Sequence, residues 1–226
     1  MSDDYDHFDA EYLGLPRYAF SRYVGELTTP PSWNEPLGAR QRWAARLGGV
    51  PADVSIVQVI VSGKSDVPVI LTNLRVEVTR RSDPVQGPVV DYCECGDVIP
   101  ERIITVDLDR SPPSITDSVD RRRWFEEGAE HRGDPIDFPY EVTRTSTEVF
   151  YLFVGTGLES PDDGCHCAWT AELSYSAGDR SGTVAIDDNG RPFEVTAVAE
   201  DADVYFSAEG EPLTSREDYY RRGGAG

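Results

Sequence analysis

From Val54 onward, the apolar residues of this chain recur at every second position. In the segment 102–109, for instance, Ile104, Val106 and Leu108 alternate with polar residues. A period of two places the apolar side chains on one face of a β-strand. Short segments of this kind, separated by turn residues, follow one another along the chain: 54–61, 67–80, 87–92, 102–109, 140–143, 147–156, 167–175, 181–187, 193–198 and 204–208.

About ten short strands separated by turns are typical of a β-sandwich. The sequence therefore predicts a mainly β protein, an immunoglobulin-like antiparallel β-sandwich with one N-terminal helix and a long inserted loop. We expect one domain over 35–208, with the helix at 35–47 and the loop at 110–139. An N-terminal extension rich in aromatic and acidic residues precedes it at 1–34, and a flexible C-terminal tail follows at 209–226.

Local signals refine this expectation. The segment 67–80 changes phase once between Leu71 and Leu74, which predicts a β-bulge. Asn189-Gly190 supplies the positive φ angles of a tight hairpin turn, and 176–179 is a second hairpin signal. Together these turns predict a meander from Cys167 to Val198.

The helix has its own start and stop signals. Asn34 is suited to cap its N-terminus and Pro36 fits its first turn. Trp43 and Leu47 lie one turn apart on one face, and Gly48 would end the helix in a left-handed turn.

Charge narrows the range of partners. Forty-one acidic residues against 21 basic residues give a net charge of −20, which opposes direct binding to nucleic acid or to an anionic membrane. The first residues carry no secretory signal, and no segment reaches the roughly 18 apolar residues needed to span a bilayer. We therefore expect a cytoplasmic protein that has no membrane contact.

All four cysteines occur in two Cys-x-Cys pairs, Cys93 with Cys95 and Cys165 with Cys167. Residues i and i+2 of a strand point to the same face, so each pair presents two sulfurs on one side. If the pairs adjoin, the four sulfurs would hold one structural zinc ion in tetrahedral geometry. One or two cross-strand disulfides, or free thiols, are the alternatives, although a reducing compartment favours the metal.

Two elements carry the side chains that contribute most to protein interfaces, namely large aromatics and arginine. They are the N-terminal extension and the long loop, and each either packs on its own domain or docks on a partner. We predict the partner-binding residues to be Tyr12, Tyr18, Tyr23, Arg121, Arg122, Arg123, Trp124 and Phe125.

Signals of catalysis are missing from the sequence. Its three histidines, His7, His131 and His166, lie far apart along the chain, and no nucleophile elbow, phosphate-binding loop or zinc-protease motif occurs. We expect no enzymatic activity, no catalytic residues and no cofactor other than the structural zinc.

Several segments, in this order, resemble a domain family of uncharacterised actinobacterial proteins of the streptomycete type: 43–51, 62–78, 106–113, 167–169 and 182–193. The resemblance covers about residues 40 to 198 and implies a β-sandwich domain. Some members carry an N-terminal helix-turn-helix domain, whereas the first fifty residues here are too short and too rich in aromatic and acidic residues for one. The family is of unknown function, so the resemblance implies no site residues.

Together these observations predict a non-enzymatic β-sandwich that binds another protein. One alternative is a sandwich that binds a small ligand or a carbohydrate on exposed aromatic rings. Another is an acidic nucleic-acid mimic that blocks a DNA-binding protein.

Overall fold

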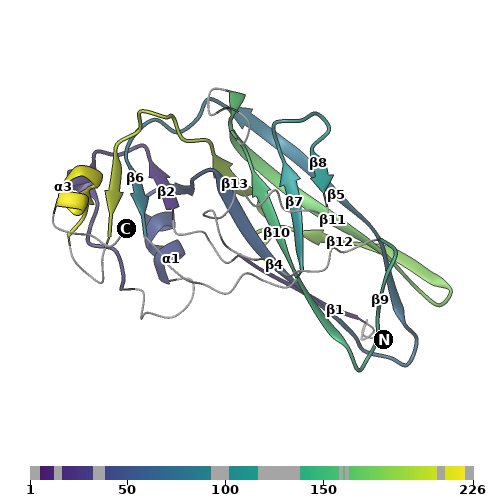
Figure 1. Ribbon diagram of the computed structural model, residues 1–226. Coiled ribbons are helices and arrows are strands. Elements are labelled where there is room, and N and C mark those ends of the chain that lie inside the picture. The colour runs from purple at the N-terminus through teal and green to yellow at the C-terminus, as the bar shows by residue number, and fades with distance from the viewer. Residues whose placement is uncertain are drawn as a thin grey trace.

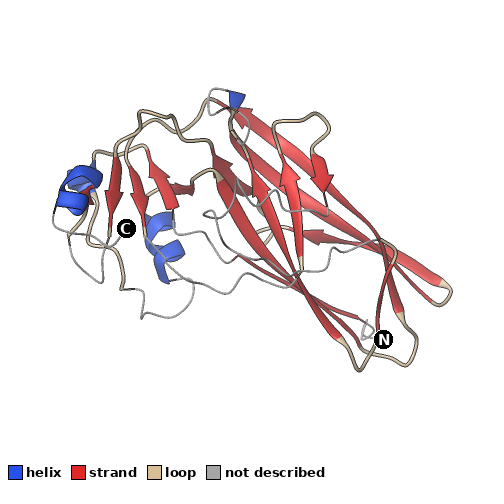
Figure 2. Ribbon diagram, viewed as in Figure 1, coloured by secondary structure: helices blue, strands red, loops and turns tan. Residues whose placement is uncertain are grey.

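The computed structural model describes residues 6–12, 17–32, 39–92, 102–116, 138–157, 160, 163–207 and 212–221. Strands dominate it, and they form three sheets (Figure 2). Two sheets pack face to face as a sandwich, and the third lies at one end of the sandwich as a small lobe with the helices (Figure 1). The predicted mainly β fold with a sandwich and an N-terminal helix is confirmed.

The first sheet of the sandwich is built around the longest alternating segments. Its strands, in spatial order, are β1 (Asp6–Tyr12), β4 (Val54–Gly63), β10 (Thr147–Gly155), β7 (Ile103–Asp107) and β8 (Ser114–Thr116). Neighbours pair antiparallel except β7 and β10, which are parallel. In β4 every second side chain from Val57 to Val61 is buried, as a period of two requires.

The second sheet of the sandwich contains β12 (Arg180–Ile186), β11 (His166–Ala177), β5 (Val69–Ser82) and β9 (Tyr140–Val142), with β13 (Phe193–Thr196) also on β11. The predicted bulge is confirmed, because Ser174 pairs with Asn73 while Tyr175 pairs with Leu71, leaving Thr72 as the extra residue. A second register shift leaves out Thr79.

The sandwich core lies between these sheets. Its largest fully buried side chains include Trp169 and Leu173 from the second sheet and Phe150 and Leu152 from the first. Trp169 stacks at a tilt on Phe193, with the ring centroids 4.8 Å apart.

One turn prediction needs correction. Gly178 adopts a φ of 62° in the predicted hairpin between β11 and β12. Asn189 and Gly190 also have the expected positive φ, at 55° and 82°. However, the strands on either side of Asn189 do not pair with each other, since β12 and β13 lie end to end along the same edge of β11. The turn at Asn189 therefore connects two strands that follow one another along one edge of β11, and it does not form the hairpin of the predicted meander.

The small lobe is organised by a third sheet, which the sequence did not predict. Its strands in spatial order are β15 (Thr214–Ser215), β14 (Val204–Phe206), β6 (Val89–Asp91), β2 (Arg17–Phe20) and β3 (Gly49–Pro51). The helices α1 (Ala39–Arg46), η1 (Val24–Glu26) and α3 (Arg216–Arg221) complete it. Trp43 of α1 packs edge-to-face against Phe20 and Tyr92 and donates from Nε1 to Thr28 Oγ1 over 3.0 Å.

The terminal segments take part in the fold. In the predicted extension, β1 adds an edge strand to the sandwich and β2 lies inside the third sheet, as the wrapping alternative requires. The predicted C-terminal tail contains β15 and α3. The predicted long loop contains β8, and its residues 117–137 lie outside the described residues. The helix caps Asn34 and Pro36 also lie outside them, whereas Gly48 ends α1 with a φ of 75°.

Candidate functional site

A pocket of about 580 Å³ opens at the seam between the sandwich and the small lobe. Asp53 and Gly157 line it from the sandwich, and Arg17, Tyr205 and Arg216 line it from the lobe. The connection from β13 to β14 supplies most of the remaining wall: Val198, Ala199, Glu200, Ala202 and Asp203.

Asp53 holds the inner wall together. It lies between β3 and β4 at a φ of 64°, a conformation that Asp tolerates better than most residues. Its N–H donates to the Thr196 carbonyl over 2.7 Å, and its own carbonyl accepts from Thr156 over 3.1 Å. Its Oδ1 accepts from the Val198 N–H over 3.0 Å. Asp53 therefore joins the ends of β10 and β13 to the corner that enters β4.

Arg17 connects this corner to the small lobe. Its Nη1 donates to Asp53 Oδ2 over 2.8 Å, and its Nε lies 3.2 Å from Asp91 Oδ2. Burial raises the pKa of both carboxyl groups, and the Arg17 charge only partly offsets this effect. The three side chains thus form a partly buried ion-pair cluster behind the pocket.

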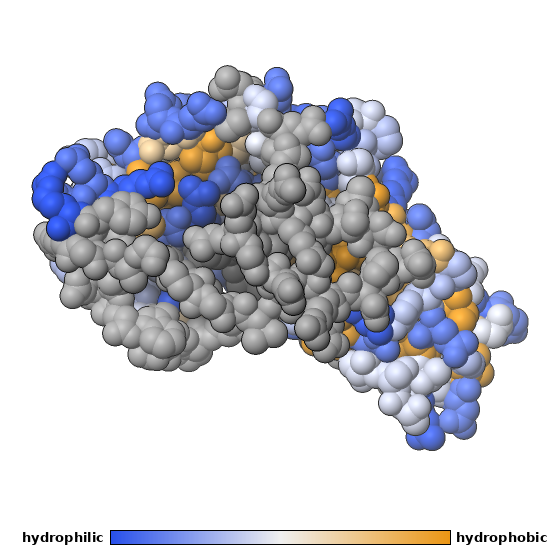
Figure 3. Space-filling view, in the orientation of Figure 1, coloured by the Kyte–Doolittle hydropathy of each residue, from blue (hydrophilic) through white to orange (hydrophobic). Residues whose placement is uncertain are grey.

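The outer part of the pocket combines the phenol ring of Tyr205 with the carboxylates of Glu200 and Asp203. Partial burial raises the pKa of Tyr205, and the nearby Asp203 charge and the Tyr23 hydroxyl raise it further. The side chain of Tyr23 is 74% exposed and is not among the residues that line the pocket. Glu200 and Asp203 have no ion-pair partner among the described residues. Figure 3 shows hydrophilic residues over α3 and the adjoining end of the lobe.

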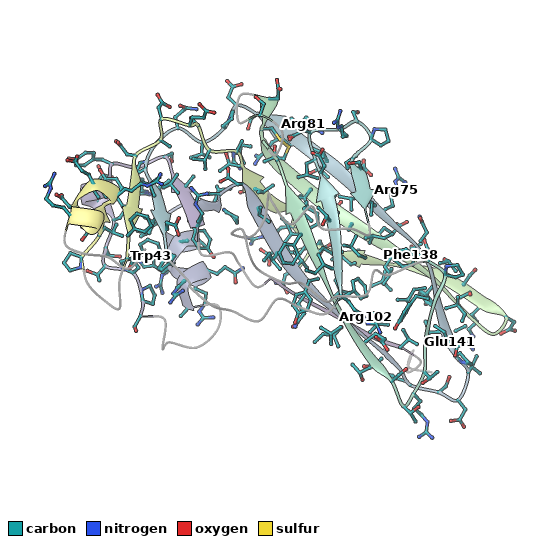
Figure 4. All side chains as sticks on the ribbon, viewed as in Figure 1. Trp43, Arg75, Arg81, Arg102, Phe138 and Glu141 are labelled. Atoms are coloured by element: carbon teal, nitrogen blue, oxygen red, sulfur yellow. A yellow bond between two sulfur atoms is a disulfide. The ribbon has the colours of Figure 1, made fainter. Side chains whose placement is uncertain are left out.

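A second chemical feature lies at the end of the sandwich. A disulfide joins Cys165 to Cys167, whose Cα atoms are 5.4 Å apart. The disulfides expected from the sequence as an alternative to zinc would join two strands. The bond instead forms within one Cys-x-Cys segment. The Arg81 Nη1 lies 3.7 Å from the Cys165 sulfur and 3.6 Å from the Cys167 sulfur (Figure 4).

The zinc prediction stays a prediction. Cys93 and Cys95 lie outside the described residues, and within those residues no three His, Cys, Asp or Glu side chains form a metal-binding group. A disulfide offers no thiolate to a metal, so Cys165 and Cys167 would hold zinc only in the reduced protein.

The predicted partner-binding residues fall into different places. Tyr12 ends β1, where its backbone pairs with Val57. Tyr18 is only 2% exposed and packs against Tyr92, so in this structure it is a core residue of the lobe and not a contact residue. Tyr23 is exposed and lies outside the set of residues that line the pocket. Arg121, Arg122, Arg123, Trp124 and Phe125 lie outside the described residues.

Sequence reasoning missed the residues that build the pocket. Arg17 and Asp53 are 36 positions apart, and no spacing rule connects them. The only available signal was local: Asp53 interrupts the apolar run between Val50 and Val54, as a turn residue would.

Comparisons of the chain with protein-family models, with curated proteins and with solved structures found no match. Within the described residues, no helix is both long enough and apolar enough to cross a membrane.

Proposed function

We propose that this protein is a non-enzymatic binding module that takes up a basic segment of a partner protein in the seam pocket. One observation carries the proposal: Glu200 and Asp203 line the pocket beside Tyr205, without an ion-pair partner among the described residues.

The charges of the pocket favour a cation. Arg17 is already engaged by Asp53 and Asp91, and Glu217 is paired with Arg221. Glu200 and Asp203 outnumber Arg216, the remaining cation of the lining, so the pocket keeps a net negative charge toward an incoming ligand. The whole chain adds to this field, because its net charge of −20 steers a basic partner toward it and repels an acidic one.

The phenol rings favour arginine over lysine within that segment. A guanidinium stacks on aromatic faces while it donates to carboxylates, and Tyr205 and Asp203 offer both in one place. Tyrosine beside arginine is also a common source of binding energy at protein interfaces.

Asp53 supports a binding role over a catalytic one. Its carboxylate accepts from Arg17 and Val198, and its backbone bonds to Thr196 and Thr156. Because the hydrogen bonds of Asp53 go to other residues of the protein, we infer that Asp53 stabilises the pocket wall and does not act on a ligand.

A small cationic ligand is the second candidate. The pocket volume of about 580 Å³ lies in the usual range for small-molecule sites, which is about 300–1,000 Å³. If this candidate is right, a small cation without a peptide backbone will by itself raise the melting temperature of the protein.

Fluorescence anisotropy tests the proposal with a labelled peptide in which arginine alternates with glycine. A peptide with glutamate in place of arginine serves as the control ligand. We expect the double variant Glu200→Gln/Asp203→Asn to weaken binding about tenfold, because two charge contacts are removed.

The matched control variant is Glu172→Gln/Asp179→Asn, which removes the same charge from exposed positions on β11 and the following hairpin. It should bind within about twofold of the wild type, since surface charges at a distance are screened by salt. Equal losses in both variants, or equal binding of both peptides, would refute a basic-segment site at the seam.

A further inference from the structure

We propose that Cys165 and Cys167 form a reversible redox-modification site, oxidised by a peroxide and reduced by a dithiol, whose state sets the shape of the seam pocket. The link to binding rests on the proposed function, whereas the redox chemistry and its effect on the pocket wall do not.

The two sulfurs differ in access. Cys165 is 7% exposed and Cys167 is fully buried. A small reagent therefore reaches Cys165 first, while Cys167 is the resolving partner that closes the bond. Their Cα separation of 5.4 Å lies in the ordinary range for a disulfide.

Arg81 favours the exchange chemistry. Its Nη1 lies within 3.7 Å of both sulfurs, and its Nη2 donates to the carbonyl oxygens of Leu108 and Arg110. The guanidinium is thus anchored beside the sulfurs. A fixed positive charge there stabilises the thiolate that leaves during reduction, and the thiolate that attacks during oxidation.

The chemistry balances in both directions. In oxidation, the Cys165 thiol loses its proton and the thiolate attacks one oxygen of hydrogen peroxide. The O–O bond breaks, a sulfenic acid forms, and the departing hydroxide takes up the released proton as one water. The Cys167 sulfur then attacks the Cys165 sulfur, the S–O bond breaks, and a second water leaves with the Cys167 proton. In reduction, a dithiol attacks one sulfur to give a mixed disulfide, then closes into its own disulfide, and both cysteines end as thiols.

Two hydrogen bonds join the disulfide to the pocket wall. The Ala197 N–H donates to the Cys165 carbonyl over 2.9 Å, and the next residue, Val198, lines the pocket. The Cys165 N–H donates to Thr156 Oγ1 over 3.0 Å, and the next residue, Gly157, lines it too.

Close packing transmits any shift along this path. A Cβ at Gly164 would lie 2.3 Å from the Ala197 Cβ and 2.8 Å from the Gly157 Cα. The segment that leads into Cys165 therefore cannot move toward these two wall segments without displacing them. Opening the bond frees Cys165 from Cys167, and we expect the wall to loosen as a result.

Intact mass spectrometry tests the redox step in a Cys93→Ser/Cys95→Ser background, so that only one pair can react. Excess dithiol should raise the mass by two hydrogens, and peroxide should remove them again. A pair that stays oxidised in the native protein under excess dithiol would overturn the proposal.

The role of Arg81 has a matched control in its neighbour. Arg81→Gln should slow reduction about two- to fivefold, the effect expected from removing one partly exposed charge. Arg80→Gln removes the same charge, but Arg80 pairs with Glu194 instead of contacting the sulfurs. Equal reduction rates in the two variants would exclude Arg81 from the site.

Hydrogen exchange tests the link to the pocket in the same background. On reduction, the amides of Ala197, Val198 and Gly157 should exchange at least tenfold faster, while that of Leu173 in the middle of β11 stays unchanged. A Cys165→Ser/Cys167→Ser variant should match the reduced protein with or without reductant.

The two proposals fail separately. Unchanged exchange at Ala197 would overturn this inference and leave peptide binding intact. Absence of peptide binding in both redox states would overturn the proposed function and leave the exchange result intact.

Discussion

Arg17 Nη1 donates to Asp53 Oδ2 over 2.8 Å, and this contact joins β2 of the small lobe to the corner that enters β4 of the sandwich. The same arginine also reaches Asp91 on β6. The geometry of the seam pocket therefore depends on a side chain from β2, which follows the sandwich strand β1 and lies within the predicted N-terminal extension.

Substitutions at Asp53 separate charge from backbone conformation. Asp53→Asn keeps a side chain that tolerates the positive φ and still accepts from Val198, so it should cost about 1 kcal/mol. Asp53→Ala also adds backbone strain and leaves Val198 without its acceptor, so it should cost about 2–4 kcal/mol. Urea denaturation followed by tryptophan fluorescence measures both. Equal losses in the two variants would contradict the assigned role of the backbone.

The pH dependence of stability should show the buried carboxyl groups. Burial raises the pKa of Asp91 above its ordinary value of 3.8, so the folded protein binds this proton more tightly than the unfolded chain does. This contribution to stability is complete below 3.8 and is lost as the pH rises through the folded-state pKa. The wild type should therefore gain stability relative to Asp91→Asn when the pH falls from about 7 to about 4.

Glu194 provides a control of opposite sign. The His166 ring, whose Nε2 lies 3.7 Å from Glu194 Oε2, lowers the pKa of Glu194 from 4.5. The contribution of Glu194 is therefore present above 4.5 and is lost as the pH falls through the folded-state pKa. The wild type should lose stability relative to Glu194→Gln over the acid range. Denaturation curves that slope the same way for both variants would contradict these assignments.

Gly164 should not tolerate a side chain. Because an added Cβ would lie 2.3 Å from the Ala197 Cβ, Gly164→Ala should destabilise the protein by about 2–3 kcal/mol through overpacking. Gly190→Ala is the comparison: it meets no atom within 4 Å but has a φ of 82°, and should cost about 1 kcal/mol. A smaller loss at Gly164 than at Gly190 would show that the wall behind the pocket is not tightly packed.

Trp43 tests whether the small lobe folds together with the sandwich. Trp43→Phe keeps a ring against Phe20 but loses the bond to Thr28, and should cost about 1–2 kcal/mol. Trp43→Ala should cost about 3–5 kcal/mol through the cavity it leaves. If the units are coupled through Arg17 and Asp53, calorimetry will show one transition at a lower temperature. A separate early transition would mean that the lobe unfolds alone.

The sandwich strands could be predicted because their signal is local. In β4 the side chains from Val57 to Val61 are buried at every second position, and the bulge at Thr72 appears directly as a change of phase. The turn at Asn189 shows the limit of such signals. Its φ angles follow from the residues present, but which strands then pair depends on the distant β11.

The third sheet could not be predicted by the same reasoning. Its strands β3 and β15 have three and two residues, too few to show a period. Its centre pairs Ala19 with Val89, which in turn pairs with Val204, so the sheet is defined by contacts between distant parts of the chain. The pocket borders this sheet, and its lining residues also come from distant parts of the chain, so it could not be predicted from local patterns either. Tyr23, which the sequence had indicated as a contact residue, is exposed but does not line the pocket.

Nuclear magnetic resonance titration with the arginine–glycine peptide tests the central claim, namely that the seam pocket is the binding site. We predict amide shifts at Asp203, Tyr205 and Tyr23, with no shift at Glu172 on β11. We also predict that these shifts disappear in Glu200→Gln/Asp203→Asn. Shifts that instead gather away from the seam, or that persist unchanged in this variant, would contradict the account.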